Sequence, residues 1–461
     1  MVVTRYLFVH NVVDDRYLLI NSLSGAVDLV DEAVVRSFAA IRRGEPHSLN
    51  SEQLEELLRR GYLYESQDDE EAAISKVLAL NERFRAREQA LCFVLCPTVS
   101  CNLRCPYCFE PHAMHEQNQV MSLEQAEKAF AALDAIRAMR PDVPNASINL
   151  FGGEPLLPTT REVVTRILML AAERQLPVTI TTNGTHVKHL LEILRPYREG
   201  LAFDITMDGT KEIHDQRRIT AAGTGTFDRI SHNVSVLLAD GFRVMIRMNL
   251  NAGNIDSAPL FLRYVREQNW HRFPHFGVSL SPVTNYTGLA GDDILPPFEV
   301  EHRVQRAVPP GLWDEVKVQL NGDFARLHLP ISEALGESRM EGRFMPSLYY
   351  CEASGALFYC MAPDGLIYPC NQIIHNPAWA IGSYDPQHVI DPARASLWQD
   401  RIVTNLPKCR DCSIAFLCAG GCPVMAARTT GSPMEPHCGT AKGELAEYLR
   451  LVTPKLVQAS K

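Results

Sequence analysis

Three cysteines in residues 101–108 (CNLRCPYC) constrain this chain more than any other feature of its sequence. With this CxxxCxxC spacing, the thiolates of Cys101, Cys105 and Cys108 can bind three irons of a cubane iron–sulfur cluster and leave the fourth iron open to another ligand. A zinc knuckle or a chance group of buried cysteines would use the same three residues. The motifs elsewhere in the chain decide between these interpretations.

Composition limits the kind of protein. A chain of 461 residues predicts two or three domains. The net charge of -9 and the absence of a long basic run argue against a nucleic-acid partner. Charged residues interrupt the apolar N-terminus at Arg5, Asp14, Asp15 and Arg16, and no apolar run is long enough for a membrane span. We therefore expect a cytoplasmic protein without a membrane partner, in which most of the 13 cysteines are metal ligands or reactive groups.

Hydrophobic periodicity predicts an α/β protein with several domains. Residues 1–65 are expected to form three strands and then two helices, as an N-terminal α+β domain, and residues 66–88 a charged linker helix. In residues 89–325, apolar strands alternate with amphipathic helices in six units, which predicts a parallel sheet. Right-handed crossovers curve such units into a partial (β/α)6 barrel whose strands all end at one mouth. The strands are predicted at residues 91–96, 147–151, 178–181, 202–207, 244–250 and 276–281.

The C-terminal part has a different character. Residues 285–345 show no periodic signal, and residues 326–350 are expected to be a linker. Residues 351–440 form a cysteine-rich region, and residues 441–461 read as an amphipathic helix. Within the cysteine-rich region, residues 358–370 predict a hairpin that pairs residue 360 with residue 368. We expect Cys92 and Cys96, in the first barrel strand, to be small buried apolar residues.

Further motifs are predicted at the ends of successive barrel strands. Gly152, Gly153, Glu154 and Pro155 follow the second strand; the glycines allow backbone to approach a ligand, and the carboxylate can accept hydrogen bonds from an ammonium group. The remaining candidates are Tyr107 between two cysteines, Asn183 after the third strand, Thr206 and Asp208 after the fourth, and Arg247 on the fifth.

These motifs resemble those of the radical S-adenosylmethionine (SAM) superfamily. The resemblance implies that SAM chelates the open iron of a [4Fe-4S] cluster held by Cys101, Cys105 and Cys108. It implies that Glu154 meets the amino group of SAM, that Thr206 contacts its ribose or carboxylate, that Arg247 pairs with its carboxylate, and that Tyr107 packs near adenine. A core aromatic is an equal alternative for Tyr107, and an arginine at a solvent edge is the alternative for Arg247. The other cofactor-binding candidates that the resemblance implies are Gly152, Gly153, Pro155, Asn183 and Asp208.

The C-terminal cysteines resemble the seven-cysteine signature of the SPASM domain, which accompanies a subset of radical SAM enzymes. The resemblance implies two auxiliary [4Fe-4S] clusters. One would be bound by Cys409, Cys412, Cys418 and Cys438, and the other by Cys351, Cys370 and Cys422. Cys360 is a candidate for the fourth ligand of the second cluster, because the predicted hairpin places it diagonal to Cys370. If Cys360 instead points into the core, that iron could accept a substrate thiolate, and zinc is the alternative metal for these thiolates.

The resemblance implies an oxidoreductase that cleaves SAM reductively and modifies or cross-links side chains of a ribosomally synthesised peptide, through thioether or carbon–carbon bonds. The strand and helix order of residues 1–65 resembles the winged-helix-like domains that bind leader peptides. A generic α+β cap is an equal alternative for residues 1–65. The expected partners are a precursor peptide with a leader and an external electron donor such as flavodoxin or ferredoxin.

Three other functions stay open. Anaerobic sulfatase-maturating enzymes have an aspartate base at the position of Asn371, and an amide cannot accept a proton at neutral pH, which disfavours that reaction. A SPASM dehydrogenase acting on a small molecule would share the same motifs. A non-catalytic iron–sulfur or zinc protein is disfavoured because Glu154, Asp208 and the cysteine motif occur together.

Overall fold

The computed structural model describes residues 1–286, 293–320, 327, 329–334, 345–374, 376–439 and 441–459. The chain forms two compact units. The sheet unit comprises residues 89–324 and 355–399, and the terminal unit comprises residues 1–88, 325–354 and 400–461. These units group the segments differently from the predicted domains, because residues 355–399 of the cysteine-rich region belong to the sheet unit, whereas residues 351–354 and those from 400 on belong to the terminal unit. Part of the predicted linker, residues 326, 328 and 335–344, lies outside the described residues.

The sheet unit is built on an eleven-stranded sheet with the order β12-β11-β10-β9-β8-β7-β6-β13-β14-β15-β16. Neighbouring strands from β12 to β13 all run parallel. Consecutive strands are neighbours from β6 to β12, as the predicted strand and helix alternation requires. Their bounds are β6 (Ala90–Leu95), β7 (Asn145–Leu150), β8 (Val178–Thr182), β9 (Leu201–Thr206), β10 (Arg243–Leu250), β11 (Phe276–Pro282) and β12 (Val318–Leu320).

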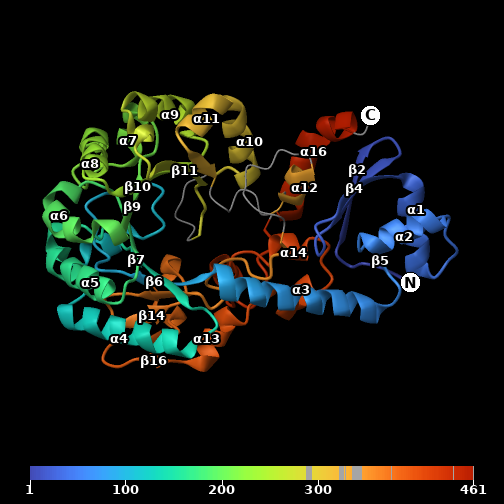
Figure 1. Ribbon diagram of the computed structural model, residues 1–461, viewed down its shortest axis with the longest axis horizontal. Helices are drawn as coiled ribbons and strands as arrows, with labels where there is room; N and C mark the ends of the chain where they lie inside the picture. The colour runs from blue at the N-terminus through green and yellow to red at the C-terminus, as the bar shows by residue number, and fades with distance from the viewer. Residues whose placement is uncertain are drawn as a thin grey trace. The chain divides into compact units, whose positions relative to one another are not determined.

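Helices cover the outside of these strands in an arc (Figure 1). Their bounds are α4 (Leu123–Met139), α5 (Arg161–Glu173), α6 (Val187–Leu194), α7 (Lys211–Arg217), α8 (Phe227–Ala239), α9 (Ala258–Glu267), α10 (Pro297–Ala307) and α11 (Pro310–Glu315). Helix α4 begins at a capping box, in which the side chains of Ser122 and Gln125 each accept a hydrogen bond from the other residue's backbone N–H. The α/β class and the six-unit partial barrel are confirmed. Strand β12 and helices α10 and α11 lie within residues 285–345, for which no periodic signal was found.

The hairpin of the cysteine-rich region belongs to the same sheet. Strands β13 (Phe358–Met361) and β14 (Leu366–Tyr368) are antiparallel, and Cys360 pairs with Tyr368 as predicted. Strand β13 also runs parallel to β6, with Cys360 opposite Val94. The sheet continues through β15 (Gly382–Ser383) to β16 (Val389–Ile390), and α13 (Pro392–Gln399) follows.

In the terminal unit, a three-stranded antiparallel sheet has the order β2-β3-β4. Leu19 of the central strand packs on one face with Phe38 and Leu57, and Leu18 packs on the other with Leu417 and Leu445. The N-terminal strands therefore share a core with the C-terminal helix. The elements are β1 (Val2–Val3), β2 (Leu7–Val13), β3 (Arg16–Asn21), β4 (Val27–Asp31), α1 (Glu32–Arg43), α2 (Ser51–Arg59), β5 (Leu63–Tyr64), α3 (Gln67–Glu88), α12 (Leu329–Ala334), α14 (Ala415–Cys418), α15 (Pro423–Thr430) and α16 (Ala441–Ala459).

None of the described helices combines the length and the apolar composition that are needed to cross a bilayer.

Candidate active site

The cysteine motif lies on the loop that leaves the carboxyl end of β6. Cys105 is buried, and Cys101 and Cys108 are partly buried. The backbone of the loop is held by the segment after α7, because the N–H of Arg104 donates to the carbonyl of Ile219 at 2.8 Å and Leu103 forms a β-bridge with Thr220. The Nδ2 of Asn183 lies 3.9 Å from the sulfur of Cys101. The segment after α7 thus holds the backbone of the loop, and Asn183 contacts its first thiol.

Gly152 and Gly153 allow the turn after β7 to lie directly against this loop. A Cβ at Gly153 would stand 2.2 Å from the carbonyl oxygen of Ser100, and one at Gly152 would stand 2.4 Å from that of Thr98. The N–H of Gly153 donates to Thr98, and that of Glu154 donates to Ser100 at 2.8 Å. The glycines are therefore required by contact within the chain, in addition to any contact with a ligand.

The carboxylate of Glu154 faces inward. It accepts hydrogen bonds from the N–H of Leu156 at 2.9 Å, from the hydroxyl of Thr182 at 2.5 Å and from the N–H of Asn183 at 2.6 Å. Glu154 is fully buried, and burial raises the pKa of its carboxyl while these three hydrogen bonds act in the opposite direction. Its side chain joins the ends of β7 and β8, where we expected it to meet the amino group of SAM.

A cavity of ≈ 390 Å³ opens where the barrel strands end. This volume is within the range of small-molecule sites. The predicted site residues that line it are Cys101, Cys105, Tyr107, Cys108, Gly152, Gly153, Asn183, Thr206 and Arg247. Glu154, Pro155 and Asp208 are not among its lining residues. The structure therefore brings nine of the predicted residues to one cavity and places the other three behind its wall.

Asp208 is the centre of a buried charged network behind the cysteine loop. Its carboxylate accepts the hydroxyl of Tyr107 and, at 3.1 Å, the N–H of Asn249. The same Tyr107 hydroxyl accepts from Arg218 at 2.8 Å, and the guanidinium of Arg217 lies 4.7 Å from the centre of the ring. Burial raises the pKa of the Tyr107 hydroxyl well above its usual value. The ring of Tyr107 is therefore held by two cations and one carboxylate.

His214 is a neutral imidazole that contacts the backbone of Asp208. Its Nδ1 accepts the backbone N–H of Asp208 at 3.3 Å. The hydroxyl of Thr226 donates to the carbonyl of Arg218, so the 3.1 Å contact between this hydroxyl and Nε2 requires that Nε2 carry the proton. Burial, helped by the charges of Arg218 and Arg217, lowers the pKa of His214 to about 3.

Arg247 reaches the cavity from β10. Its Nε donates to Asp204 of β9 at 3.0 Å, and its Nη2 contacts the same carboxylate oxygen. Arg247 stands beside Thr206 in the register of the two strands. This arginine thus lines the cavity and does not face solvent at an edge of the sheet.

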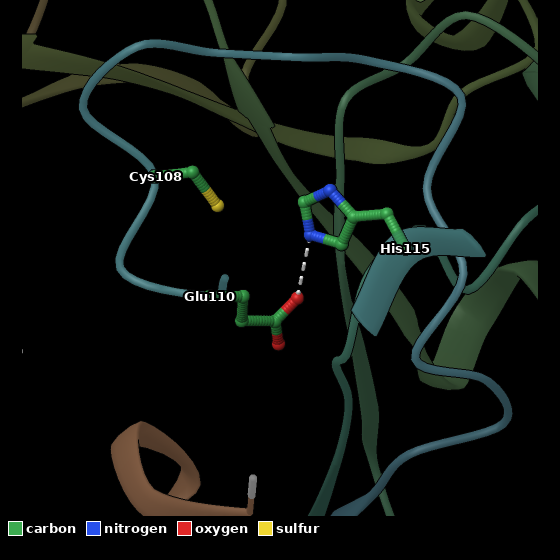
Figure 2. A group of neighbouring side chains, drawn as sticks. All are labelled: Cys108, Glu110 and His115. Atoms are coloured by element: carbon green, nitrogen blue, oxygen red, sulfur yellow. Dashed lines mark hydrogen bonds and ion pairs between the residues drawn. The ribbon is translucent and has the colours of Figure 1, made fainter. Parts of the chain in front are cut away.

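Glu110 and His115 are cavity residues that the sequence analysis missed (Figure 2). The Nε2 of His115 lies 3.2 Å from a carboxylate oxygen of Glu110, and both side chains are buried. One ligand atom of each lies within 4.8 Å of the other and of the Cys108 sulfur. Among the described lining residues, Glu110 supplies the one carboxylate and His115 the one imidazole. The position of Glu110 two residues after Cys108 was the signal that could have identified it.

The C-terminal cysteines of the terminal unit fall into two groups. Cys418, Cys412 and Cys438 lie near enough to Cys409 to raise its pKa when they are thiolates, so these four sulfurs are neighbours. Cys351 lies near enough to Cys422 to raise its pKa in the same way, so these two sulfurs form the second group. Cys360 and Cys370 belong to the sheet unit, where Cys360 is fully buried and has Cys96, Cys370 and Cys92 among its neighbours. The ligand assignments stay predictions.

The comparison with protein families identifies the domain that carries much of the cavity lining. The model of the radical SAM superfamily matches residues 95–258, which include the cysteine loop and the glycine turn.

The chain contains a radical SAM domain.

Its relatives include enzymes. A cysteine-type anaerobic sulfatase-maturating enzyme of Clostridium novyi is 24% identical over 340 residues, which cover 70% of this chain and 85% of the relative. Streptococcus suis SuiB bound to its precursor peptide SuiA has a similar fold, with a TM-score of 0.58, 16% identity and coverage of 96% of this chain and 99% of SuiB. The structure of anSMEcpe with bound AdoMet gives a TM-score of 0.55 at 19% identity, over 80% of this chain and 95% of that one. These findings confirm the predicted resemblance and show that the chain is an enzyme.

The thiols of the radical SAM domain fit an iron–sulfur cluster. Burial raises the pKa values of Cys101 and Cys105, and burial raises that of Cys108 to about 12. Cys105 and Cys108 lie near enough to Cys101 to raise its pKa further when they are thiolates, so the three sulfurs lie close together. Thiols that a low-polarity site keeps protonated become thiolates when a cation is bound, and iron supplies that cation.

Gly153→Ala tests the contact between the glycine turn and the cysteine loop. The new Cβ meets backbone at Ser100, so the two segments must separate at a cost of about 1–3 kcal/mol. We expect a lower Tm and less cluster iron per chain after reconstitution. Gly200→Ala is the control, because no atom lies within 4 Å of the Cβ that it adds. Equal iron contents and equal Tm values in the two variants would contradict the argument.

The neutral His214 predicts a pH dependence of stability. Below a pH of about 6.5 the unfolded chain takes up a proton at this histidine, whereas the folded chain does not until about 3. Folding therefore loses about 1.4 kcal/mol per pH unit as the pH falls through this window. We expect Tm to fall less between pH 7.5 and 5.5 in His214→Gln than in the unchanged protein. The same fall in both would show that His214 titrates normally in the folded state.

Proposed function

We propose that the chain is a peptide maturase that oxidatively modifies or cross-links side chains of a ribosomally synthesised peptide. The carrying observation is the cavity at the strand ends, where three cysteines and a double-glycine turn meet beside polar strand-end residues. A [4Fe-4S] cluster with an open iron, held by Cys101, Cys105 and Cys108, would supply reductive cleavage of SAM to a 5′-deoxyadenosyl radical.

The chain's own residues bind and orient the reactants in this proposal. Asn183 approaches Cys101 and donates to Asn102 at 2.8 Å, so it holds the cysteine loop at the cavity wall. Thr206 and Arg247 present a hydroxyl and a guanidinium to the cavity from neighbouring strands, and these groups suit the ribose and carboxylate of SAM. Tyr107, whose hydroxyl contacts Asp208 and Arg218, lines the same cavity.

The SAM roles of Glu154 and Asp208 are indirect in this proposal. The carboxylate of Glu154 is used by three donors of the chain, and that of Asp208 holds Tyr107 and Asn249. Both residues position elements that line the cavity. The carbonyl of Pro155 accepts the hydroxyl of Thr160 at 2.6 Å.

A peptide substrate is supported by the related proteins. SuiB is seen with its precursor peptide, and anSMEcpe with the Cp18Cys peptide. We propose residues 1–65 as the site that binds the leader of the substrate peptide. Strands β2 and β4 each pair with a single strand in their sheet, and an extended peptide can add to such an edge. An external electron donor such as flavodoxin or ferredoxin would supply the electrons.

Sulfatase maturation is the second candidate, because named relatives carry out that reaction. Asn371 and Gln372 line the cavity where an aspartate base would be required. An amide side chain cannot accept the substrate proton. Oxidation of a cysteine or serine in a sulfatase-derived peptide by the purified chain would favour this candidate over peptide cross-linking.

SAM cleavage provides the first test of the proposed function. Anaerobically reconstituted protein with SAM and dithionite is expected to form 5′-deoxyadenosine, and Cys105→Ala is expected to abolish it because one of three cluster ligands is lost. Loss of roughly a third of about twelve irons would accompany the substitution if two auxiliary clusters are also present. Cys92→Ala is the control, because Cys92 is not a predicted ligand. No 5′-deoxyadenosine from fully iron-loaded protein would overturn the enzyme mechanism.

The substrate class has a separate test. Co-expression with a short peptide encoded beside this chain is expected to yield a peptide that lacks two hydrogens, detected by mass spectrometry. Fragment masses then show which residues lost the hydrogens, and these residues identify the bond that is formed. An unmodified peptide alongside active SAM cleavage would reject this peptide as the substrate.

A further inference from the structure

Arg401 is a fully buried cation in the terminal unit, with no part in the SAM site. Its guanidinium donates four hydrogen bonds, and every acceptor is a backbone carbonyl. Nε donates to Pro433 at 2.5 Å, Nη1 to Gly421 at 2.8 Å, and Nη2 to Gly420 at 2.8 Å and to Glu435 at 3.1 Å. One side chain therefore organises two separate loops.

Both loops carry cysteines. Gly420 and Gly421 lie between Cys418 and Cys422, and Pro433 and Glu435 precede Cys438. The two glycines have φ values of 77° and 71°, which a side chain rarely adopts. A Cβ at Gly421 would also stand 2.0 Å from the carbonyl oxygen of His437. The tight turn between the two cysteines is thus shaped so that its carbonyls converge on Arg401.

The charge of Arg401 has no carboxylate partner in the described part of the chain. The side chain of Glu435 instead pairs with Lys408 at 3.0 Å. Burial lowers the pKa of Arg401, and the sulfurs of Cys422, Cys351, Cys409 and Cys418 lie near enough to raise it when they are thiolates. An isolated buried cation is strongly unfavourable, and carbonyl dipoles carry no net charge. Anionic thiolate ligands are the compensation that the surroundings offer.

We infer that Arg401 is the counter-cation and positioning residue of the predicted auxiliary iron–sulfur site of Cys409, Cys412, Cys418 and Cys438 in the terminal unit. It holds the loops of Cys418, Cys422 and Cys438 by their carbonyls and offsets the negative charge of the bound cluster. A fixed positive charge favours the reduced cluster, which carries one more electron, so Arg401 raises the reduction potential. This inference rests on the predicted auxiliary clusters and concerns a residue outside their ligand sets.

The test uses the full chain with Cys101→Ala, Cys105→Ala and Cys108→Ala, so that only auxiliary clusters can form. Arg401→Gln removes the charge, and Arg401→Lys keeps it while losing the fork of donors. Lys408→Gln is the matched control, because it removes one positive charge next to Cys409 from a side chain that is 71% exposed. Each protein is reconstituted with iron and sulfide, and iron per chain, Tm with and without clusters, and the midpoint potential by EPR titration are measured.

We expect Arg401→Gln to lower the midpoint potential, or to lose cluster iron, and to reduce the rise in Tm that cluster loading gives. Arg401→Lys retains more iron and a higher potential than Arg401→Gln, and Lys408→Gln matches the parent. The inference is overturned if Arg401→Gln equals the parent, if the Lys and Gln variants behave alike, or if Lys408→Gln has as large an effect. If the parent protein binds no iron, the prediction of auxiliary clusters is wrong, and the inference about Arg401 is overturned with it.

Discussion

The site depends on one close backbone contact, between the turn after β7 and the segment that precedes Cys101. Gly152 and Gly153 leave no room for a Cβ at Thr98 and Ser100, and backbone hydrogen bonds join the same segments. On the inner side, the carboxylate of Glu154 ties this turn to the end of β8. The cysteine loop therefore rests on the ends of three neighbouring strands, and it presents its thiols to the cavity because those strands fix its base.

Much of the sheet unit could be predicted because its signals are local. Apolar runs of five to eight residues alternate with amphipathic helices, and each strand end carries a polar motif. The same local logic located the hairpin and its pairing of Cys360 with Tyr368. Side-chain direction at a strand end is not a local property. For Glu154 and Asp208 the sequence shows only carboxylates near a ligand site. Their direction is set by donors such as Asn183, which follows β8, and Asn249 of β10.

Other features escaped prediction because they depend on contacts between distant segments. Strand β12 has three residues, which is too short for a periodic signal, and it exists because β11 offers a parallel edge. The burial of β3 on both faces requires helix α16, more than 400 residues later in the sequence. The cage around Arg401 consists of backbone carbonyls, and their convergence cannot be recognised from residue types.

The pairing of β6 with β13 has a consequence for how such a chain can be divided. Strand β6, which leads into the cysteine loop, has β7 on one side and β13 on the other, so it is an interior strand of the sheet. A chain that stopped before residue 358 would leave its backbone donors and acceptors exposed along an apolar edge, open to pairing with other molecules. The cysteine-rich region therefore cannot be exchanged as a freestanding cassette. Recombination that altered it would also have to provide a substitute strand for the barrel.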